Sequence, residues 1–186
     1  LKNLAVSAVD LLLIHWPNPK IPLARSIKAL CEVKSSGLAR HIGISNFPSK
    51  LMSEALALTT EPFSCHQGEY HAHVDQSKVL ALCRKHAMAF TAYTPLGRGT
   101  QGGVITEPSV IAIAERLGRT PAQVALRWLV QQPGVVAVPK SSNPQRLAEN
   151  LDVFSFALTD DDMSALSKLA RPNGRVVSVA FAPEWD

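Results

Sequence analysis

The sequence has 186 residues, of which 46% are hydrophobic and 18% charged, and its formal net charge is +4. The length fits a single domain, 1–186, and the composition is that of an ordinary globular protein. No run of 18 apolar residues is present, which argues against a membrane-spanning helix, and the scattered Lys and Arg residues argue against nucleic acid as a partner.

The first ten residues, LKNLAVSAVD, do not resemble a secretory signal, because no basic end precedes a long apolar core. Leu1, Leu4, Ala5 and Ala8 follow helical spacing, but no capping residue precedes them. We therefore expect the sequence to open within a helix.

The three cysteines, Cys31, Cys65 and Cys83, are scattered and odd in number. This pattern favours a reducing, cytoplasmic compartment over a disulfide framework. It also provides no Cys-x-x-Cys pair, so we expect no metal site.

Short β-prone runs alternate with helical patterns along the chain. Gly37 ends the first helical pattern, and Thr120, Asn143 and Thr159 each resemble an N-cap. The predicted strands are 11–16, 41–46, 63–70, 88–94 and 135–140, and helices are predicted at 22–36 and 76–86 and after each of the three caps.

This alternation predicts an α/β fold with parallel strands and right-handed crossovers. The short spacing between strands suits a (β/α)8 barrel of the TIM type. No G-x-G-x-x-G follows any strand, so the fingerprint of the other common dinucleotide-binding fold is absent from the sequence.

Polar side chains stand at the end of every predicted strand. Functional groups of parallel barrels gather at the carboxyl ends of the strands, so we expect these residues to meet on one face. They are His15 with Trp16, Ser45 with Asn46, Gln67 with Glu69 and Tyr70, Tyr93, and Lys140 with Ser141.

Each strand-end residue also has a structural alternative. His15 could be a core histidine with a satisfied partner, and Asn46 could cap the helix that follows it. Gln67 and Tyr93 could be buried with their polar atoms bonded, and Lys140 could be a solvated charge. These alternatives must all hold at the same end of the strands, which favours a functional site.

The segment KSSNPQR, 140–146, places two cations and two hydroxyls around a predicted helix start. Helix N-termini attract phosphate through free N–H groups and the helix dipole. Arg146 would lie one turn into the helix, where its guanidinium could pair with a phosphate. The segment therefore predicts a phosphate-bearing ligand, the alternative being a surface helix with ordinary basic residues.

Several of these stretches resemble signatures of the aldo-keto reductase family. DLLLIHWP resembles the fourth barrel strand with the catalytic histidine, GLARHIGISNF resembles the fifth-strand signature, and TPLGRG resembles the loop after the seventh strand. VPKSSNPQRLAEN resembles the eighth-strand signature that holds the 2′-phosphate of NADPH. The ending GRVVSVAFAPEWD is similar to bacterial 2,5-diketo-D-gluconate reductases of the B type.

The resemblance implies a role for each of these residues. His15 would hydrogen-bond the substrate carbonyl, Trp16 would line the substrate pocket, and Tyr93 would stack on the nicotinamide ring. The other cofactor contacts would be Ser45, Asn46 and Gln67 at the carboxamide, Thr94, Pro95, Leu96, Gly97 and Arg98 along the pyrophosphate, Lys140, Ser141 and Arg146 with Ser142 beside them at the 2′-phosphate, and Glu149 and Asn150 at the adenine.

The chain departs from the family pattern around Gln67. His66 and Gly68 flank it where the family has Asn and Val, and Ala72 stands where the family has Pro. Gly68 removes a side chain from the interior of a strand, which weakens packing there. These departures affect the expected geometry near Gln67 more than cofactor binding as a whole.

The resemblance also implies that the chain holds only strands four to eight of the barrel. The family's Tyr acid, with its Lys and Asp, lies on strands that precede His15, and Tyr70 and Tyr93 match later positions. We therefore expect NADPH-dependent reduction of aldehydes or ketones, with weak or no activity for this chain alone.

Two other functions compete with this expectation. A non-catalytic module could bind NADPH, or bind a partner through the open edges of an incomplete barrel. A phosphate-sugar isomerase or aldolase would need a Schiff-base lysine, for which Lys140 is the candidate at a strand end.

Overall fold

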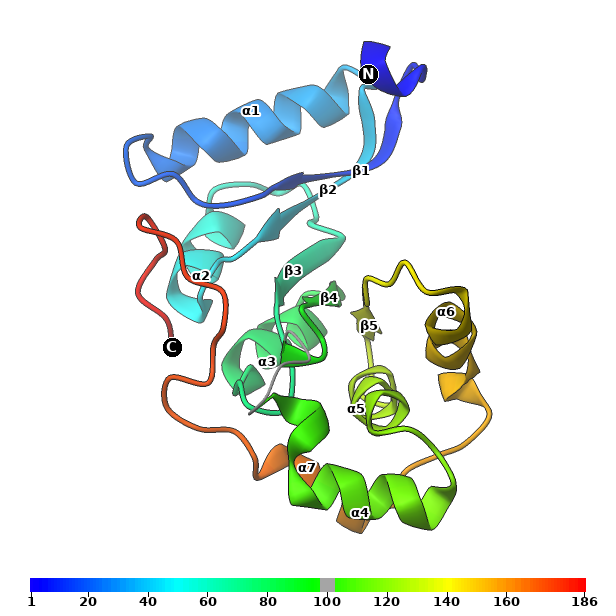
Figure 1. The fold of residues 1–186 in the computed structure, drawn as a ribbon. Helices are drawn as coiled ribbons and strands as arrows, with labels where there is room; N and C mark the ends of the chain where they lie inside the picture. The colour runs from blue at the N-terminus through cyan, green and yellow to red at the C-terminus, as the bar shows by residue number, and fades with distance from the viewer. Residues whose placement is uncertain (98–102) are drawn as a thin grey trace. The chain divides into compact units, whose positions relative to one another are not determined.

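The computed structural model describes residues 1–97 and 103–186 (Figure 1). Strands and helices alternate as the sequence predicts. In chain order the strands and α-helices are β1 Val9–Ile14, α1 Leu23–Ser35, β2 Ala39–Ser45, α2 Ser49–Ala57, β3 Cys65–Glu69, α3 Ser77–Lys85, β4 Ala89–Tyr93, α4 Pro108–Leu117, α5 Pro121–Val130, β5 Val135–Ala137, α6 Pro144–Leu151 and α7 Asp160–Ser167. Short 3-10 turns lie at Lys2–Leu4 (η1), Val104–Thr106 (η3) and Asp152–Phe154 (η4).

The strands form one sheet in the order β1-β2-β3-β4-β5. The pairs β1/β2 and β2/β3 are parallel, with Ile14 opposite Ile44 and Ser45 opposite Gln67. The predicted α/β class with parallel strands is therefore confirmed. The register places the carboxyl ends of β1 and β2 within one residue of each other, whereas β3 continues for two residues beyond Gln67.

The chain divides into two compact units. Unit 1 comprises residues 1–68, 77–90 and 179–186, and unit 2 comprises residues 69–76 and 91–178. Each unit contains buried apolar side chains from both strands and helices.

The core of unit 1 lies between the first strands and their helices. Ile42 and Ile44 of β2 are fully buried, and Ile27 of α1 and Met52 of α2 are buried with them. Complete burial of an aliphatic side chain of this size contributes about 1.5–3 kcal/mol. Residues 42–45 of β2 are buried without interruption, as expected for a parallel strand that is covered on both faces.

The core of unit 2 is built around α5. Val124, Leu126 and Leu129 are buried at 0–1% exposure. The helix begins with a reciprocal capping box, in which the Thr120 side chain accepts from Gln123 N and the Gln123 side chain accepts from Thr120 N. The sequence predicted this start, and Thr159, another predicted cap, forms the same motif with Asp162.

The first strand ends at Ile14, before the predicted end at residue 16, and larger differences occur at the opening segment and at the last strand. The expected opening helix is only the 3-10 turn η1, which Ala5 ends in a left-handed conformation at φ 52°. Leu1 and Leu4 are exposed, so no buried face supports a longer helix. The last strand is also shorter than predicted and stops at Ala137, two residues before Pro139, which has no N–H for pairing.

Gly43 provides a test of the strand pairing. A Cβ at Gly43 would lie 2.3 Å from the carbonyl oxygen of Cys65 and 2.7 Å from the Leu13 side chain. Because the nearest atom belongs to the backbone, Gly43→Ala must displace strand β3, and we expect a loss of about 2–3 kcal/mol in the free energy of unfolding.

The matched control is Gly134→Ala, whose added methyl meets no atom within 4 Å but sits at φ +76°. It should cost about 1 kcal/mol from backbone strain alone. Urea denaturation of both variants measures the difference, and equal losses would contradict the close approach of β2 and β3.

Candidate functional site

Asn46 joins the ends of three strands in unit 1. Its side-chain Nδ2 donates to the His15 carbonyl at 2.8 Å and to Ser45 Oγ at 3.1 Å, and its backbone N donates to the Gln67 carbonyl at 2.9 Å. Asn46 adopts a left-handed conformation at φ 64°, which Asn tolerates better than most residues. The residue thus fixes His15 and Gln67 relative to β2.

The capping role considered for Asn46 is wrong. Helix α2 begins at Ser49, and its N-cap, Pro48, makes no side-chain hydrogen bond. The helix start is instead met by Asp186, whose carboxylate accepts from Ser49 N at 2.8 Å and from Ser49 Oγ at 2.5 Å. An anionic group is favourable at this position because of the helix dipole.

His15 follows directly after β1, and its side chain is exposed rather than buried in the core. Its ring centroid lies 6.5 Å from that of Trp16. Trp16 makes edge contacts with Phe181 at 6.0 Å and with Trp185 at 6.1 Å. An aromatic cluster from the loop after β1 and the tail of unit 1 therefore stands beside the candidate catalytic histidine.

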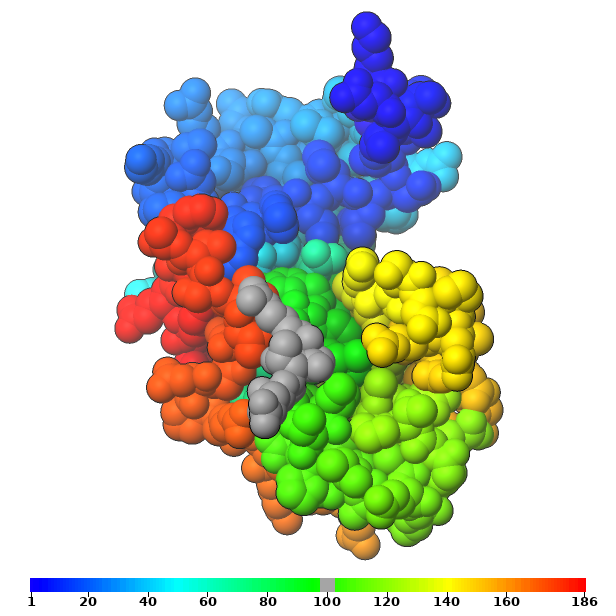
Figure 2. Space-filling view, in the orientation of Figure 1, coloured from blue at the N-terminus to red at the C-terminus, as the bar shows by residue number. Residues whose placement is uncertain are grey.

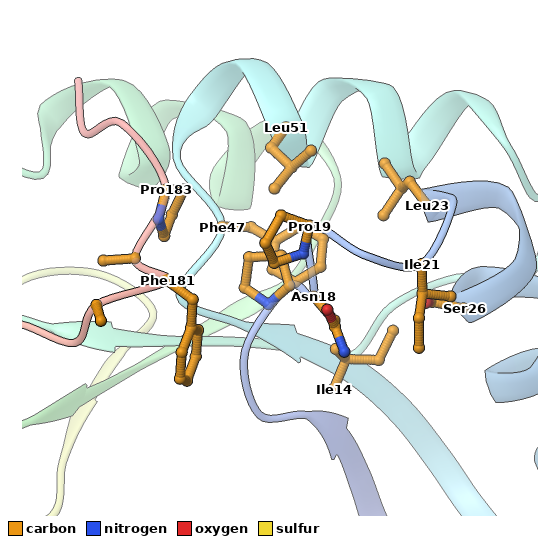
Figure 3. Close-up of a pocket in the computed structure, with 13 residues that line it drawn as sticks. Ile14, Asn18, Pro19, Ile21, Leu23, Ser26, Phe47, Leu51, Phe181 and Pro183 are labelled. Atoms are coloured by element: carbon orange, nitrogen blue, oxygen red, sulfur yellow. The ribbon is translucent and has the colours of Figure 1, made fainter.

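A mainly apolar cavity of about 430 Å³ lies in unit 1, and Phe181 of the aromatic cluster is one of its lining residues. Figure 3 shows that side chains from the loop after β1, from α1, from α2 and from the tail surround it. Its lining includes Ile14, Phe47, Leu51 and Phe181, and neither His15 nor Trp16 belongs to the lining described. The pocket role predicted for Trp16 therefore stays a prediction.

The departures around Gln67 have a local explanation. The His66 ring stacks on Phe90 at 5.4 Å, and its Nε2 donates to the Phe47 carbonyl at 2.9 Å. A Cβ at Gly68 would lie 3.0 Å from the Phe90 ring. The small residue thus leaves room for the stacked pair, while Gln67, the central residue of β3, is half-buried.

Tyr93, the last residue of β4, belongs to unit 2 and is half-buried. Burial and the nearby Glu69 carboxylate raise the pKa of its phenol to about 12. The phenol also interacts with the backbone of Glu69. The Tyr93 hydroxyl therefore has a partner, as in the alternative in which Tyr93 is a structural residue. This interaction leaves the face of the ring available for a ligand.

A second pocket, of about 630 Å³, lies within unit 2. It brings together eight residues that the sequence placed along one cofactor. They are Thr94, Pro95, Leu96, Lys140, Ser141, Arg146, Glu149 and Asn150. Lys140 and Arg146 are exposed, and the α6 region that carries them is yellow on the molecular surface in Figure 2.

The start of α6 differs in detail from the expected phosphate site. The Asn143 side chain accepts from the backbone N of Gln145 at 2.9 Å and of Arg146 at 3.5 Å. Two N–H groups of the first turn are therefore already used. A phosphate here would depend mainly on the side chains of Lys140 and Arg146 and on nearby hydroxyls.

The remaining predicted residues have different outcomes. Gly97 (φ +59°) and Ser142 do not belong to the lining of the unit 2 pocket, and Arg98 lies outside the described residues. Thr120, Ala122 and Val138 also line the pocket, although the sequence analysis did not predict them as site residues. The predicted helix start at Thr120-Pro121 was the signal that could have suggested the first two.

The sequence reasoning also missed a buried ionic cluster after β3. Glu69 and His71 are fully buried, and His71 Nε2 donates to Glu69 Oε1 at 3.1 Å. The backbone N–H groups of Val176 and Val177 donate to the same carboxylate at 2.6 and 3.2 Å. The only sequence signal was a Glu and a His two residues apart at a strand end.

Two features are absent from the described residues, 1–97 and 103–186. No group of three or more His, Cys, Asp or Glu side chains there could hold a metal ion. No helix in that part of the chain is long and apolar enough to cross a bilayer.

Comparisons with known proteins agree on one family. The model of the Aldo/keto reductase family matches residues 1–171. An aldo-keto reductase of Mycobacterium avium is 40% identical over 170 residues, which cover 91% of this chain and 58% of that protein. The chain thus spans about three fifths of the length of this curated relative.

Solved structures give the same result. The crystal structure of a putative 2,5-diketo-D-gluconic acid reductase B superposes with a TM-score of 0.95 at 47% identity, covering 100% of this chain and 66% of that one. A Bombyx mori aldo-keto reductase in complex with NADP has a TM-score of 0.87 at 30% identity, covering 97% and 63%.

The Glu69 cluster predicts a pH dependence of stability. Burial by itself raises the pKa of the Glu69 carboxyl, but the interactions with His71, Val176 and Val177 outweigh burial and lower the pKa below its ordinary value of 4.5. The stabilisation is therefore complete above pH 4.5 and is lost as the pH falls through the lower native pKa. Urea denaturation should show the stability difference between wild type and Glu69→Gln shrinking over that range.

The control for this measurement is Glu115→Gln, which neutralises an exposed carboxylate on α4 in the same unit. Its stability difference from wild type should stay near zero at every pH. A difference for Glu69→Gln that stayed constant from pH 7 to pH 3 would contradict the lowered pKa.

Proposed function

Because the chain belongs to the aldo/keto reductase family, we propose that it forms the cofactor-binding and carbonyl-orienting part of an NADPH-dependent carbonyl reductase. The observation that carries this proposal is the unit 2 pocket, where residues from three separate segments, 94–96, 140–141 and 146–150, line one space. We further propose that β1 to β5 correspond to strands four to eight of the family's barrel within one domain, 1–186.

The donor set of the pocket suits a nucleotide that carries an extra phosphate. Lys140 offers an ammonium and Arg146 a forked guanidinium, which pairs with phosphate through two parallel hydrogen bonds. Glu149 and Asn150 provide acceptors and a side-chain amide at the same wall, where the family resemblance places the adenine. This distribution favours NADPH over NADH as the cofactor.

The unit 1 residues suit binding and orientation of the substrate carbonyl. When bound, the cofactor supplies a hydride to the carbonyl carbon. His15 would hydrogen-bond the carbonyl oxygen, and its imidazole is a side chain of the kind that acts as a general acid toward a developing alkoxide. Asn46 fixes the backbone at His15, and Ser45, Asn46 and Gln67 lie together where the resemblance places the carboxamide.

The substrate class follows from the relatives rather than from the pocket alone. A putative 2,5-diketo-D-gluconic acid reductase B is similar over the whole chain. We propose small aldehydes, ketones or α-keto sugars as substrates. The exposed His15 beside an aromatic cluster is consistent with a compact, partly polar carbonyl compound.

A second candidate is a chain that binds NADPH without turnover. The specific observation is that both tyrosines in the sequence are engaged elsewhere. The Tyr70 hydroxyl donates to Gln132 Oε1 at 2.8 Å, and the Tyr93 phenol interacts with Glu69. Neither tyrosine of this chain is therefore placed to act as the family's tyrosine acid, which favours NADPH binding without turnover by this chain alone.

The two cations provide a direct test of the cofactor assignment. A charge-assisted hydrogen bond contributes about 1.5–3 kcal/mol, so Lys140→Ala or Arg146→Ala should weaken NADPH binding by about 10- to 100-fold. NADH binding should change far less, because NADH has no 2′-phosphate. Fluorescence titration of both nucleotides measures this, with Lys168→Ala, an exposed cation in the same unit, as the control.

A second test separates the reductase from the binding module. The purified protein is assayed with NADPH and a panel of aldehydes and α-keto sugars, and any turnover should fall by about 10²- to 10⁴-fold in His15→Phe. NADPH affinity should be unchanged in that variant. Tight NADPH binding with no turnover on any substrate would favour the non-catalytic candidate, and no binding at all would overturn both.

A further inference from the structure

Residues 171–177, here called the strap, are held by a buried carboxylate after β3. Glu69 accepts backbone hydrogen bonds from Val176 at 2.6 Å and Val177 at 3.2 Å, and Arg175 Nη1 lies 4.0 Å from the same group. Glu69 itself is fully buried. A buried carboxylate is stable only when its oxygens are paired, so Glu69 and the strap depend on each other.

A second contact fixes the other end of the strap. The Arg171 backbone N donates to the His73 carbonyl at 3.2 Å, and its guanidinium donates to His73 Nδ1 at 3.2 Å and to Glu107 at 3.4 Å. His73 Nε2 in turn donates to Glu107 at 2.6 Å. A Cβ at Gly174 would lie 1.8 Å from the His73 carbonyl oxygen, so the backbones are in direct contact.

The same carboxylate lies next to Tyr93. The Tyr93 phenol interacts with the backbone and the charge of Glu69 and with the charge of Arg175. All of these groups belong to unit 2. The side chain at the end of β4 and the strap therefore share one buried anchor, although they are about 80 residues apart in sequence.

We propose that Glu69 is a positioning residue that couples the order of the strap to the orientation of the Tyr93 ring, and thereby to binding of the nicotinamide half of the cofactor. The inference rests on the proposed function for the role of Tyr93, but the anchoring of the strap does not. Loss of the Glu69 charge weakens the acceptor of the strap amides and removes the charge beside the Tyr93 phenol.

The test compares two ligands and one structural readout in Glu69→Gln. Hydrogen exchange of the Val176 and Val177 amides should accelerate at least tenfold, because their acceptor is weakened. NADPH affinity should fall about tenfold. Affinity for 2′-phosphoadenosine, which lacks the nicotinamide, should stay unchanged, a pattern that general unfolding would not produce.

A second variant keeps the experiment decisive if Glu69→Gln folds poorly. Gly174→Ala places a methyl against the His73 carbonyl and should displace the strap without changing Glu69. It should show the same faster exchange and the same selective loss of NADPH affinity. Glu115→Gln, with its exposed carboxylate in unit 2, should change none of the three measurements.

Three results would overturn the proposal. If hydrogen exchange of the Val176 and Val177 amides is unchanged in both variants, Glu69 does not anchor the strap. If exchange accelerates but NADPH affinity stays at the wild-type value, the strap is not coupled to cofactor binding. Equal loss of affinity for NADPH and 2′-phosphoadenosine would reduce Glu69 to a general structural role. Failure of the wild-type protein to bind either ligand would overturn the proposed function, and the exchange data would then decide the anchoring by themselves.

Discussion

The parallel pairing of β1, β2 and β3 is the constraint on which the first part of the site depends. Its register puts Ile14 opposite Ile44 and Ser45 opposite Gln67, so the ends of β1 and β2 lie close to the level of Gln67 in β3. Gly43 permits this closeness because no side chain stands between β2 and the Cys65 carbonyl. Asn46 then closes the ends with hydrogen bonds to His15 and Gln67, and the candidate catalytic histidine leaves the sheet at a fixed point.

Unit 2 uses charge in two different ways. Lys140 and Arg146 are exposed at a pocket wall, where they keep their hydration until an anion replaces it. Glu69 is fully buried, and hydrogen bonds from His71 and from the strap compensate for its lost hydration. The first arrangement is suited to binding a charged ligand, whereas the second is suited to fixing the chain.

The sequence predicted most of the fold, because its signals are local. Apolar runs indicated the strands, and the predicted N-caps at Thr120 and Thr159 are confirmed. The errors also have local causes: an exposed opening segment supports only a 3-10 turn, and Asn46 turns its side chain toward His15 instead of capping α2. A residue with positive φ at a strand end is compatible with either role until its neighbours are known.

The sequence by itself determined the alternation of strands and helices, the family, and the polar residues at the strand ends. These follow from periodicity, capping chemistry and short contiguous motifs, which need no knowledge of distant contacts. Only the tertiary structure decided that Thr94, Lys140 and Glu149 line one pocket and that Val176 and Val177 bond to Glu69. Thr94 stands 46 positions before Lys140, and Glu69 stands 107 and 108 positions before Val176 and Val177. No local pattern records which distant group will compensate a buried charge.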